Sequence, residues 1–86
     1  MKTGNTQQRL HVEYYALLRE QAGLDKEELD THAHTPAQLY AELAERYGFS
    51  LAASHLRVAV NESFADWSQP LAAGDTVVFI PPVAGG

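Results

Sequence analysis

The sequence predicts a single α+β domain in which a mixed sheet of four or five strands packs on one main helix, with a short helix in addition. Three observations lead to this fold class. Several segments alternate apolar and polar residues, only one segment is a long amphipathic helix, and 86 residues leave no room for a second core. A sheet with one such helix buries its apolar face most economically in two layers.

The first half of the chain begins with a polar stretch and continues with the patterns of a strand, a short helix and a second strand. Residues 1–9 show no periodicity, and we expect them to form a mobile leader. The first strand is predicted by the alternating apolar residues Leu10, Val12 and Tyr14. Residues 16–22 have the pattern of about two helical turns that end at Gly23, and residues 26–35 return to strand alternation with a polar outer face.

The main helix is predicted over residues 36–47. Thr35 can act as its N-cap, Pro36 occupies the first helical position, and Gln38 is placed to complete a capping box. Its apolar stripe consists of Leu39, Leu43 and Tyr47. Gly48 then offers a left-handed stop, so one long face of this helix must be buried against the sheet.

The second half of the chain supplies the remaining strands. Alternation predicts a third strand over residues 56–61, and the Asn61-Glu62 turn leads into a short pairing over residues 63–65. Gly74 takes a positive φ in the following loop, and Thr76–Ile80 forms a last strand inside the sheet. With the first two strands antiparallel and the main helix as a right-handed crossover, this order of elements is that of the ubiquitin-like β-grasp fold.

Composition excludes several classes of function. The net charge is −5, and the six Lys and Arg residues are scattered, which argues against binding to nucleic acid or to an anionic membrane. The chain has no cysteine, so disulfides, thiolate zinc sites and a cysteine nucleophile are not available to it. No apolar run approaches the length of about 20 residues that a membrane span requires, and we expect a cytoplasmic protein.

The chain ends in the sequence PPVAGG, which we interpret as a tail over residues 81–86 that follows a domain over residues 10–80. Pro81 and Pro82 stop the sheet ladder and project the tail from the domain. The tail itself consists of Pro81, Pro82, Val83, Ala84, Gly85 and Gly86. Because glycine has no Cβ, such an end can enter a narrow tunnel in another protein. Its α-carboxylate becomes reactive once it is adenylated, and a sulfur donor can then convert it to a thiocarboxylate.

The chain from about residue 10 to its end resembles the small, sulfur-carrying subunit of molybdopterin synthase, which is a ubiquitin-like β-grasp family. The matching stretches are YYALLREQAG (14–23), VAVNES (58–63) and LAAGDTVVFIPPVAGG (71–86). This resemblance implies that a ubiquitin-activating-like enzyme adenylates Gly86 with ATP and that the residue is then thiocarboxylated. The tail would enter the large synthase subunit and give its sulfur to cyclic pyranopterin monophosphate, and two deliveries would build the dithiolene.

The same resemblance implies a non-catalytic subunit and co-substrate without a permanently bound cofactor, since the catalytic residues would belong to the large subunit. The expected assembly is a heterotetramer with two copies of each chain. In this family the position of Ala84 is often a hydroxyl residue, and an alanine there is also found in the sulfur carriers of thiamine thiazole synthesis. Those carriers usually lack the counterpart of residues 16–23 and rarely have the Pro-Pro pair. A ubiquitin-like protein modifier and a plain β-grasp interaction module are further alternatives.

Partner-binding residues are expected near the tail and on the short helix. Phe79 and Ile80 point to opposite faces of the last strand, and the one that faces outward is the candidate interface anchor. The family resemblance suggests that Arg19 contacts the activating enzyme. Phe64 and Trp67 belong either to the core or to an exposed docking patch.

Two other groups of polar residues could be mistaken for chemical sites. His32 and His34 lie on one side of the predicted second strand, but solvent-facing positions explain them and no metal is expected. The acidic run over residues 25–30 is interpreted as a solvated outer face rather than as a catalytic pair of carboxylates.

Overall fold

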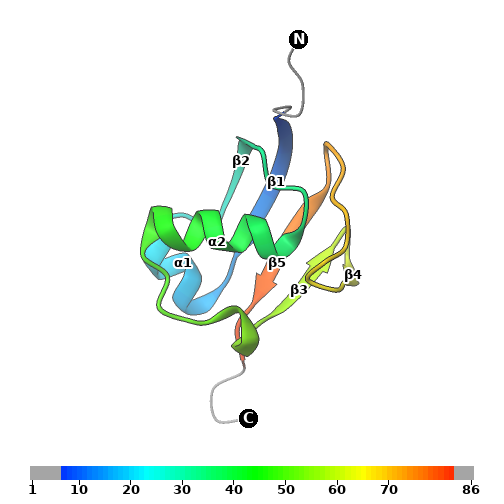
Figure 1. Cartoon of the computed structure of the whole chain (residues 1–86). Coiled ribbons are helices and arrows are strands. Elements are labelled where there is room, and N and C mark those ends of the chain that lie inside the picture. The colour runs from blue at the N-terminus through cyan, green and yellow to red at the C-terminus, as the bar shows by residue number, and fades with distance from the viewer. Residues whose placement is uncertain (1–6, 83–86) are drawn as a thin grey trace.

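A computed structural model describes residues 7–82, in which strands and helices form two layers (Figure 1). In chain order the elements are β1 (Gln8–Tyr14), α1 (Ala16–Ala22), β2 (Lys26–Thr31), α2 (Pro36–Tyr47), a 3₁₀ turn (Ala53–His55), β3 (Arg57–Val60), β4 (Ser63–Phe64) and β5 (Thr76–Ile80). Helix α2 lies across one face of the sheet (Figure 1). The predicted α+β class and the β-grasp arrangement are confirmed.

The sheet has five strands in the order β2-β1-β5-β3-β4. Strand β5 therefore lies in the centre, parallel to β1 and antiparallel to β3, as predicted for the last strand. Strands β1 and β2 form the predicted antiparallel pair. Because β1 and β5 are parallel and Tyr14 lies opposite Phe79, the start of α1 and the chain leaving β5 come to the same edge of the sheet.

Helix α2 begins and ends as its sequence indicates. The N–H of Gln38 donates to Thr35 Oγ1 at 3.2 Å, which is the predicted N-cap. The Gln38 side chain reaches back one residue further than in the usual capping box, because its Oε1 accepts from the N–H of His34 at 2.7 Å. Gly48 ends the helix with a φ of 72°.

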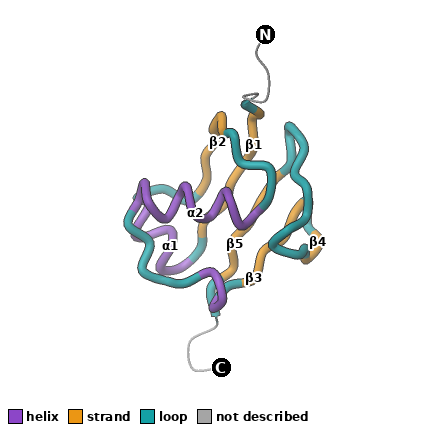
Figure 2. The backbone as a smooth tube through the Cα atoms, viewed as in Figure 1, coloured by secondary structure: helices purple, strands orange, loops and turns teal. Residues whose placement is uncertain are grey.

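The core contains a continuous group of aromatic side chains between the sheet and α2. Trp67 stacks on Phe79 with ring centroids 5.9 Å apart, and Tyr40 meets both rings edge-on. Trp67 therefore belongs to the rim of the core, whereas 68% of Phe64 is exposed. The loop over residues 65–75 that carries Trp67 connects β4 to β5 (Figure 2) and is joined to the start of α2, where the N–H of Ala37 donates to Trp67 O.

Strand β2 ends at Thr31, so its predicted extension to residue 35 is wrong. Thr31 is the last residue of β2 to pair with β1, and its Oγ1 accepts from the N–H of Ala33 at 3.0 Å, which turns the backbone out of the ladder. His32 and His34 consequently lie in an exposed loop rather than on one side of a strand. Within residues 7–82 no group of three or more His, Cys, Asp or Glu could hold a metal ion.

Strand β1 begins at Gln8, inside the segment expected to be a leader. The Gln8 side chain donates to the carbonyl oxygens of Ala33 and Leu71, both at 3.2 Å, which anchors the start of the strand to two loops.

Neither helix of this part of the chain is long and apolar enough to cross a membrane.

Candidate functional site

The tail leaves the domain from the middle of the sheet. Ile80 is the last residue of β5, and Pro81 and Pro82 follow it; we refer to these three residues as the tail root. The predicted tail residues Val83, Ala84, Gly85 and Gly86 lie outside the described residues. The described part of the candidate site is therefore the surface around the tail root.

Strand β5 presents alternate side chains to the two faces of the sheet. Val77 and Phe79 are fully buried under α2, whereas Val78 and Ile80 are half-buried on the opposite side, which we name the open face. Phe79 is therefore not an interface anchor, and its assignment as a partner-binding residue is corrected. Its ring is enclosed by Trp67 and Tyr40 in the core. Ile80 is the residue of the pair that can contact a partner.

The open face over β5, β3 and β4 carries a row of apolar residues. Val78 lies opposite Ala59 of β3, and Ala59 lies opposite Phe64 of β4, so these residues form one row across the strands. Ile80 is the next residue of β5 on this face and the first residue of the tail root. We name this surface the apolar half of the open face; it consists of Ala59, Phe64, Val78 and Ile80. Its large exposed ring, Phe64, is a hydrophobic contact point of the kind found at docking sites.

The start of α1 adds a second exposed aromatic residue beside this surface. Tyr15 is 49% exposed, and it lines one shallow hollow together with Glu13 and Val78. Its hydroxyl donates to Glu13 Oε1 at 3.1 Å, and this hydrogen bond raises the pKa of Tyr15. Ala16 follows with a φ of 54°, a left-handed conformation that is uncommon for alanine. Sequence reasoning missed Tyr15, although two adjacent tyrosines at a strand end indicate that one of them faces outward.

Arg19 lies on α1 and is exposed, so its side chain is free to contact another protein. It belongs to the element that adjoins the tail root at the shared edge of β1 and β5. No salt bridge holds Arg19 within residues 7–82. Its predicted contact with an activating enzyme stays a prediction.

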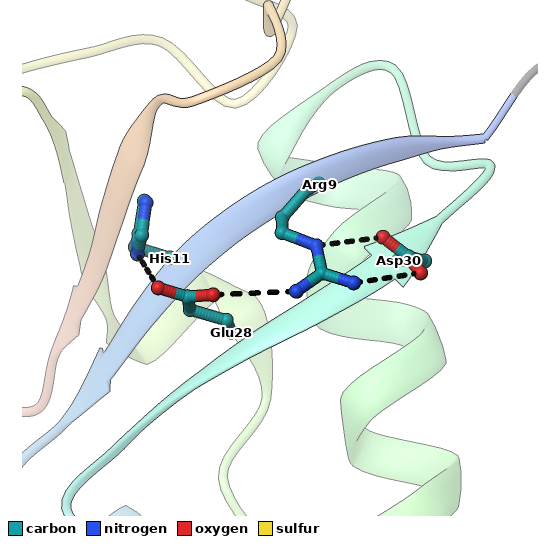
Figure 3. Close-up of polar contacts among 4 residues, drawn as sticks. All are labelled: Arg9, His11, Glu28 and Asp30. Carbon is teal, nitrogen blue, oxygen red and sulfur yellow. Dashed lines mark hydrogen bonds and ion pairs between the residues drawn. The ribbon is translucent and has the colours of Figure 1, made fainter.

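The open face over β1 and β2 carries charged and polar side chains that contact one another within the chain (Figure 3). Arg9 donates two hydrogen bonds to Asp30, at 3.1 and 3.2 Å, and one to Glu28 at 3.3 Å. His11 Nδ1 lies 3.3 Å from the other oxygen of Glu28. The hydrogen bonds to Asp30 and then its charge raise the pKa of Arg9. We name these four residues the charged half of the open face; its carboxylates are neutralised locally and do not form a catalytic pair.

One member of the acidic run points the other way, into the protein. Glu27 Oε2 accepts hydrogen bonds from the hydroxyls of Tyr14 at 2.6 Å and Tyr47 at 2.7 Å. Burial first and the bond to Glu27 second raise the pKa of both phenols. The interpretation of the run as a solvated face is therefore wrong for Glu27, which joins β2 to β1 and α2 and has a structural role.

Comparisons with known proteins agree with this arrangement. A model of the ThiS family matches residues 12–86. The molybdopterin synthase sulfur carrier subunit of Escherichia coli (strain K12) is 34% identical over 80 residues, which cover 90% of this chain and 99% of that protein. SAMP1 from Haloferax volcanii has a TM-score of 0.73 at 25% identity and covers 91% of this chain and 99% of its own.

A chain in the complex of subunits 1 and 2 of molybdopterin-converting factor from Helicobacter pylori 26695 is also similar. It has a TM-score of 0.62 at 26% identity, over 91% of this chain and 99% of that chain. Since the family model and the Escherichia coli relative extend over nearly all the elements described above, the chain belongs to the ThiS family and is a homologue of molybdopterin synthase sulfur carrier subunits.

Proposed function

We propose that this chain is the sulfur carrier of a molybdopterin synthase. Its C-terminal Gly86 is adenylated, converted to a thiocarboxylate and used to donate sulfur to cyclic pyranopterin monophosphate. The observation that carries the proposal is the 34% identity to a molybdopterin synthase sulfur carrier subunit along 99% of that protein. The geometry supports it, because the central strand β5 ends at the tail root beside an apolar surface that no described segment covers.

The chemistry requires little of the chain beyond a presented carboxylate. Attack of the Gly86 carboxylate on ATP releases pyrophosphate and forms an acyl adenylate, and a sulfur donor then replaces AMP at the carbonyl carbon. The resulting thiocarboxylate is the sulfur nucleophile of a chain that has no cysteine of its own. ATP is bound by the activating enzyme, and this chain holds no permanent cofactor. The domain contributes recognition, and Pro81 and Pro82 end the ladder of β5 where the tail begins.

Two partners follow from this function. A ubiquitin-activating-like adenylyltransferase receives the tail first, with Arg19 as a contact, and the large synthase subunit receives it afterwards. The solved complex of subunits 1 and 2 from Helicobacter pylori supports the second pairing. Ile80 and the rest of the apolar half contact the large subunit, which supplies the catalytic residues, in a heterotetramer with two copies of each chain. The cytoplasm is the proposed location.

A second candidate function is protein modification through the same terminus. The similarity to SAMP1, a small archaeal modifier protein from Haloferax volcanii, favours it. Thiamine thiazole synthesis is the third use of such a tail. These functions share the fold and the activated glycine, so the fate of the terminal acyl group distinguishes them.

The deciding experiment begins with the intact mass of the chain purified from its own host. Exchange of one oxygen for sulfur at the terminus is expected for a carrier, whereas conjugates on lysines of other proteins indicate a modifier. The thiocarboxylated chain is then mixed either with the large subunit and cyclic pyranopterin monophosphate or with thiazole synthase and its substrates. Dithiolene formation in the first mixture is the expected result. Turnover in the second mixture alone would assign the chain to thiamine synthesis.

A further inference from the structure

A hollow that contains an arginine lies directly at the tail root. It is lined by Ser54, His55, Leu56, Arg57, Ile80, Pro81 and Pro82. Leu56 is buried, whereas His55 and Arg57 are exposed. The 3₁₀ turn and β3 therefore form one wall, and the tail root forms the other. The hollow therefore adjoins the place where the tail begins.

Arg57 differs from the arginines that are paired with carboxylates. Arg9 is bonded to Asp30 and Glu28, and Arg46 lies 3.3 Å from Glu42. Within residues 7–82 Arg57 forms no salt bridge, although the chain has 11 acidic residues. Its guanidinium instead lies 5.2 Å from the centroid of the Phe64 ring.

This cation–π contact places a positive charge on the apolar half, where Arg57 is also the cross-strand neighbour of Ile80. Arg57 forms no side-chain hydrogen bond or salt bridge within residues 7–82, so the N–H groups along its guanidinium edges are left to donate. A guanidinium edge of this kind is suited to a carboxylate, which accepts two parallel hydrogen bonds. Arginine held by an aromatic ring is also a frequent contributor of binding energy at protein interfaces.

We propose that Arg57 and the hollow beside it receive an aspartate or glutamate side chain of the synthase large subunit. The inference rests on the proposed function and adds a partner residue type to it. The large subunit is favoured over the activating enzyme because Arg57 is continuous with the apolar half through Phe64 and Ile80. Permanent subunit interfaces are more apolar than transient ones, so this surface suits the partner that keeps the chain as a subunit.

The first test measures the affinity of the full-length chain for the large subunit by calorimetry at low and high salt. Arg57→Ala should weaken binding by about 5-fold, and Arg57→Glu by more than about 10-fold, at low ionic strength. Both differences should shrink at about 1 M salt, where charges are screened within about 3 Å. The matched control is Arg46→Ala, which removes the same charge from α2 and should leave the affinity within about 2-fold of the unchanged chain.

The second test locates the partner carboxylate by charge exchange. Acidic residues around the tail-binding site of the large subunit are replaced by lysine one at a time, and one replacement should restore binding to Arg57→Glu. Unchanged affinity of Arg57→Glu, or a loss that no exchange restores, would overturn the inference. Slower adenylation of Gly86 in Arg57→Glu with normal binding to the large subunit would also overturn it, because the carboxylate would then belong to the activating enzyme.

The same proteins separate this inference from the proposed function. A chain without Gly86 should lose sulfur transfer but keep the salt-dependent contribution of Arg57 to binding. If Arg57→Glu binds normally and the Gly86 deletion abolishes transfer, only the inference fails. If the unchanged thiocarboxylated chain forms no dithiolene with the large subunit, the proposed function fails.

Discussion

The two halves of the open face belong to the same sheet. The side chains of the charged half are paired within the chain, whereas those of the apolar half are left exposed. In the charged half, the register of β1 and β2 places Arg9 opposite Asp30 and His11 opposite Glu28, so both side chains contact a carboxylate within the chain (Figure 3). In the apolar half, Phe64 is 68% exposed and Ile80 lies beside the tail. A surface whose charges are already paired gains little from a partner, whereas an exposed apolar surface gains by burial.

The tail root lies beside only one of these halves, the apolar half. Strand β5 lies between β1 and β3, and its outward residues Val78 and Ile80 continue the apolar row of β3 and β4. The chain then leaves the sheet at Pro81, next to the hollow that contains Arg57. The comparison therefore predicts that partner binding depends on the apolar half and that the charged half can be altered with little effect on it.

The largest expected effect comes from the tail itself. Deletion of Gly86 should abolish sulfur transfer, because the group that is adenylated and thiocarboxylated is removed from its position. The melting temperature should stay nearly unchanged, since the core extends along β5 only as far as Phe79. Dithiolene formation and thermal unfolding are measured on the same preparation. Transfer that persists in the shortened chain would contradict the mechanism.

The next largest effect tests the two halves against each other. Phe64→Ala should weaken binding to the large subunit by about 10- to 30-fold, as expected when a large aromatic contact of an interface is removed. Its melting temperature should change little because the ring is mostly exposed. Arg9→Ala is the control from the charged half and should bind normally. Equal losses for the two variants would show that the halves do not differ in function.

The periodicity of the sequence was sufficient to predict the element order and the central place of the last strand, because alternation and helix caps are local signals. It could not decide between Phe79 and Ile80. Alternation shows that two neighbours face opposite ways, but only the pairing of Phe79 with Tyr14 shows which face lies under α2. The contact between Arg57 and Phe64 depends likewise on the β3–β4 register and had no local signal.

The inward position of Glu27 was present in the alternation of the sequence. Glu27 alternates in phase with Leu29 and Thr31, the inward residues of β2, so its burial side was predictable from position alone. The acidic composition of residues 25–30 obscured that phase. The end of β2 at Thr31 was harder to predict from the sequence, because it depends on where β1 begins and on a hydrogen bond from the N–H of Ala33 to the Thr31 side chain.

The inward-facing carboxylate gives a stability prediction that contrasts with the exposed acids of the charged half. Tyr14→Phe removes one of two hydrogen bonds to Glu27 and should lower the free energy of unfolding by about 0.5–1.5 kcal/mol at neutral pH. The pKa values of Tyr14 and Tyr47 are raised in the folded state. Their contribution is therefore complete below the unfolded tyrosine pKa of about 10 and is lost as the pH rises above it.

Denaturant unfolding between pH 7 and pH 11 measures this effect. The unchanged chain should lose stability above about pH 10, where the unfolded phenols ionise and the folded ones stay protonated. Tyr14→Phe should show a shallower decline, because one of the phenols with a raised pKa is gone. Parallel curves for the two proteins would contradict the assignment of raised pKa values to this pair.

The smallest effect concerns the hairpin that presents Phe64 at the edge of the apolar half. Asn61 and Glu62 connect β3 to β4 with φ values of 52° and 73°, and a left-handed conformation is unfavourable for glutamate. Asn61 is compensated, since its side chain accepts from the N–H of Thr76 and donates to Asp75, both at 2.9 Å. No hydrogen bond of the Glu62 side chain occurs within residues 7–82, and the residue is exposed.

Glu62→Gly should therefore raise the free energy of unfolding by about 0.5–1 kcal/mol, measured in urea. The matched control is Glu45→Gly in the exposed last turn of α2, where glycine should lower stability by about 0.5–1 kcal/mol. A turn relieved of strain should hold Phe64 as before, so binding to the large subunit should stay the same. Weaker binding by Glu62→Gly, despite a more stable fold, would mean that the left-handed glutamate itself belongs to the interface.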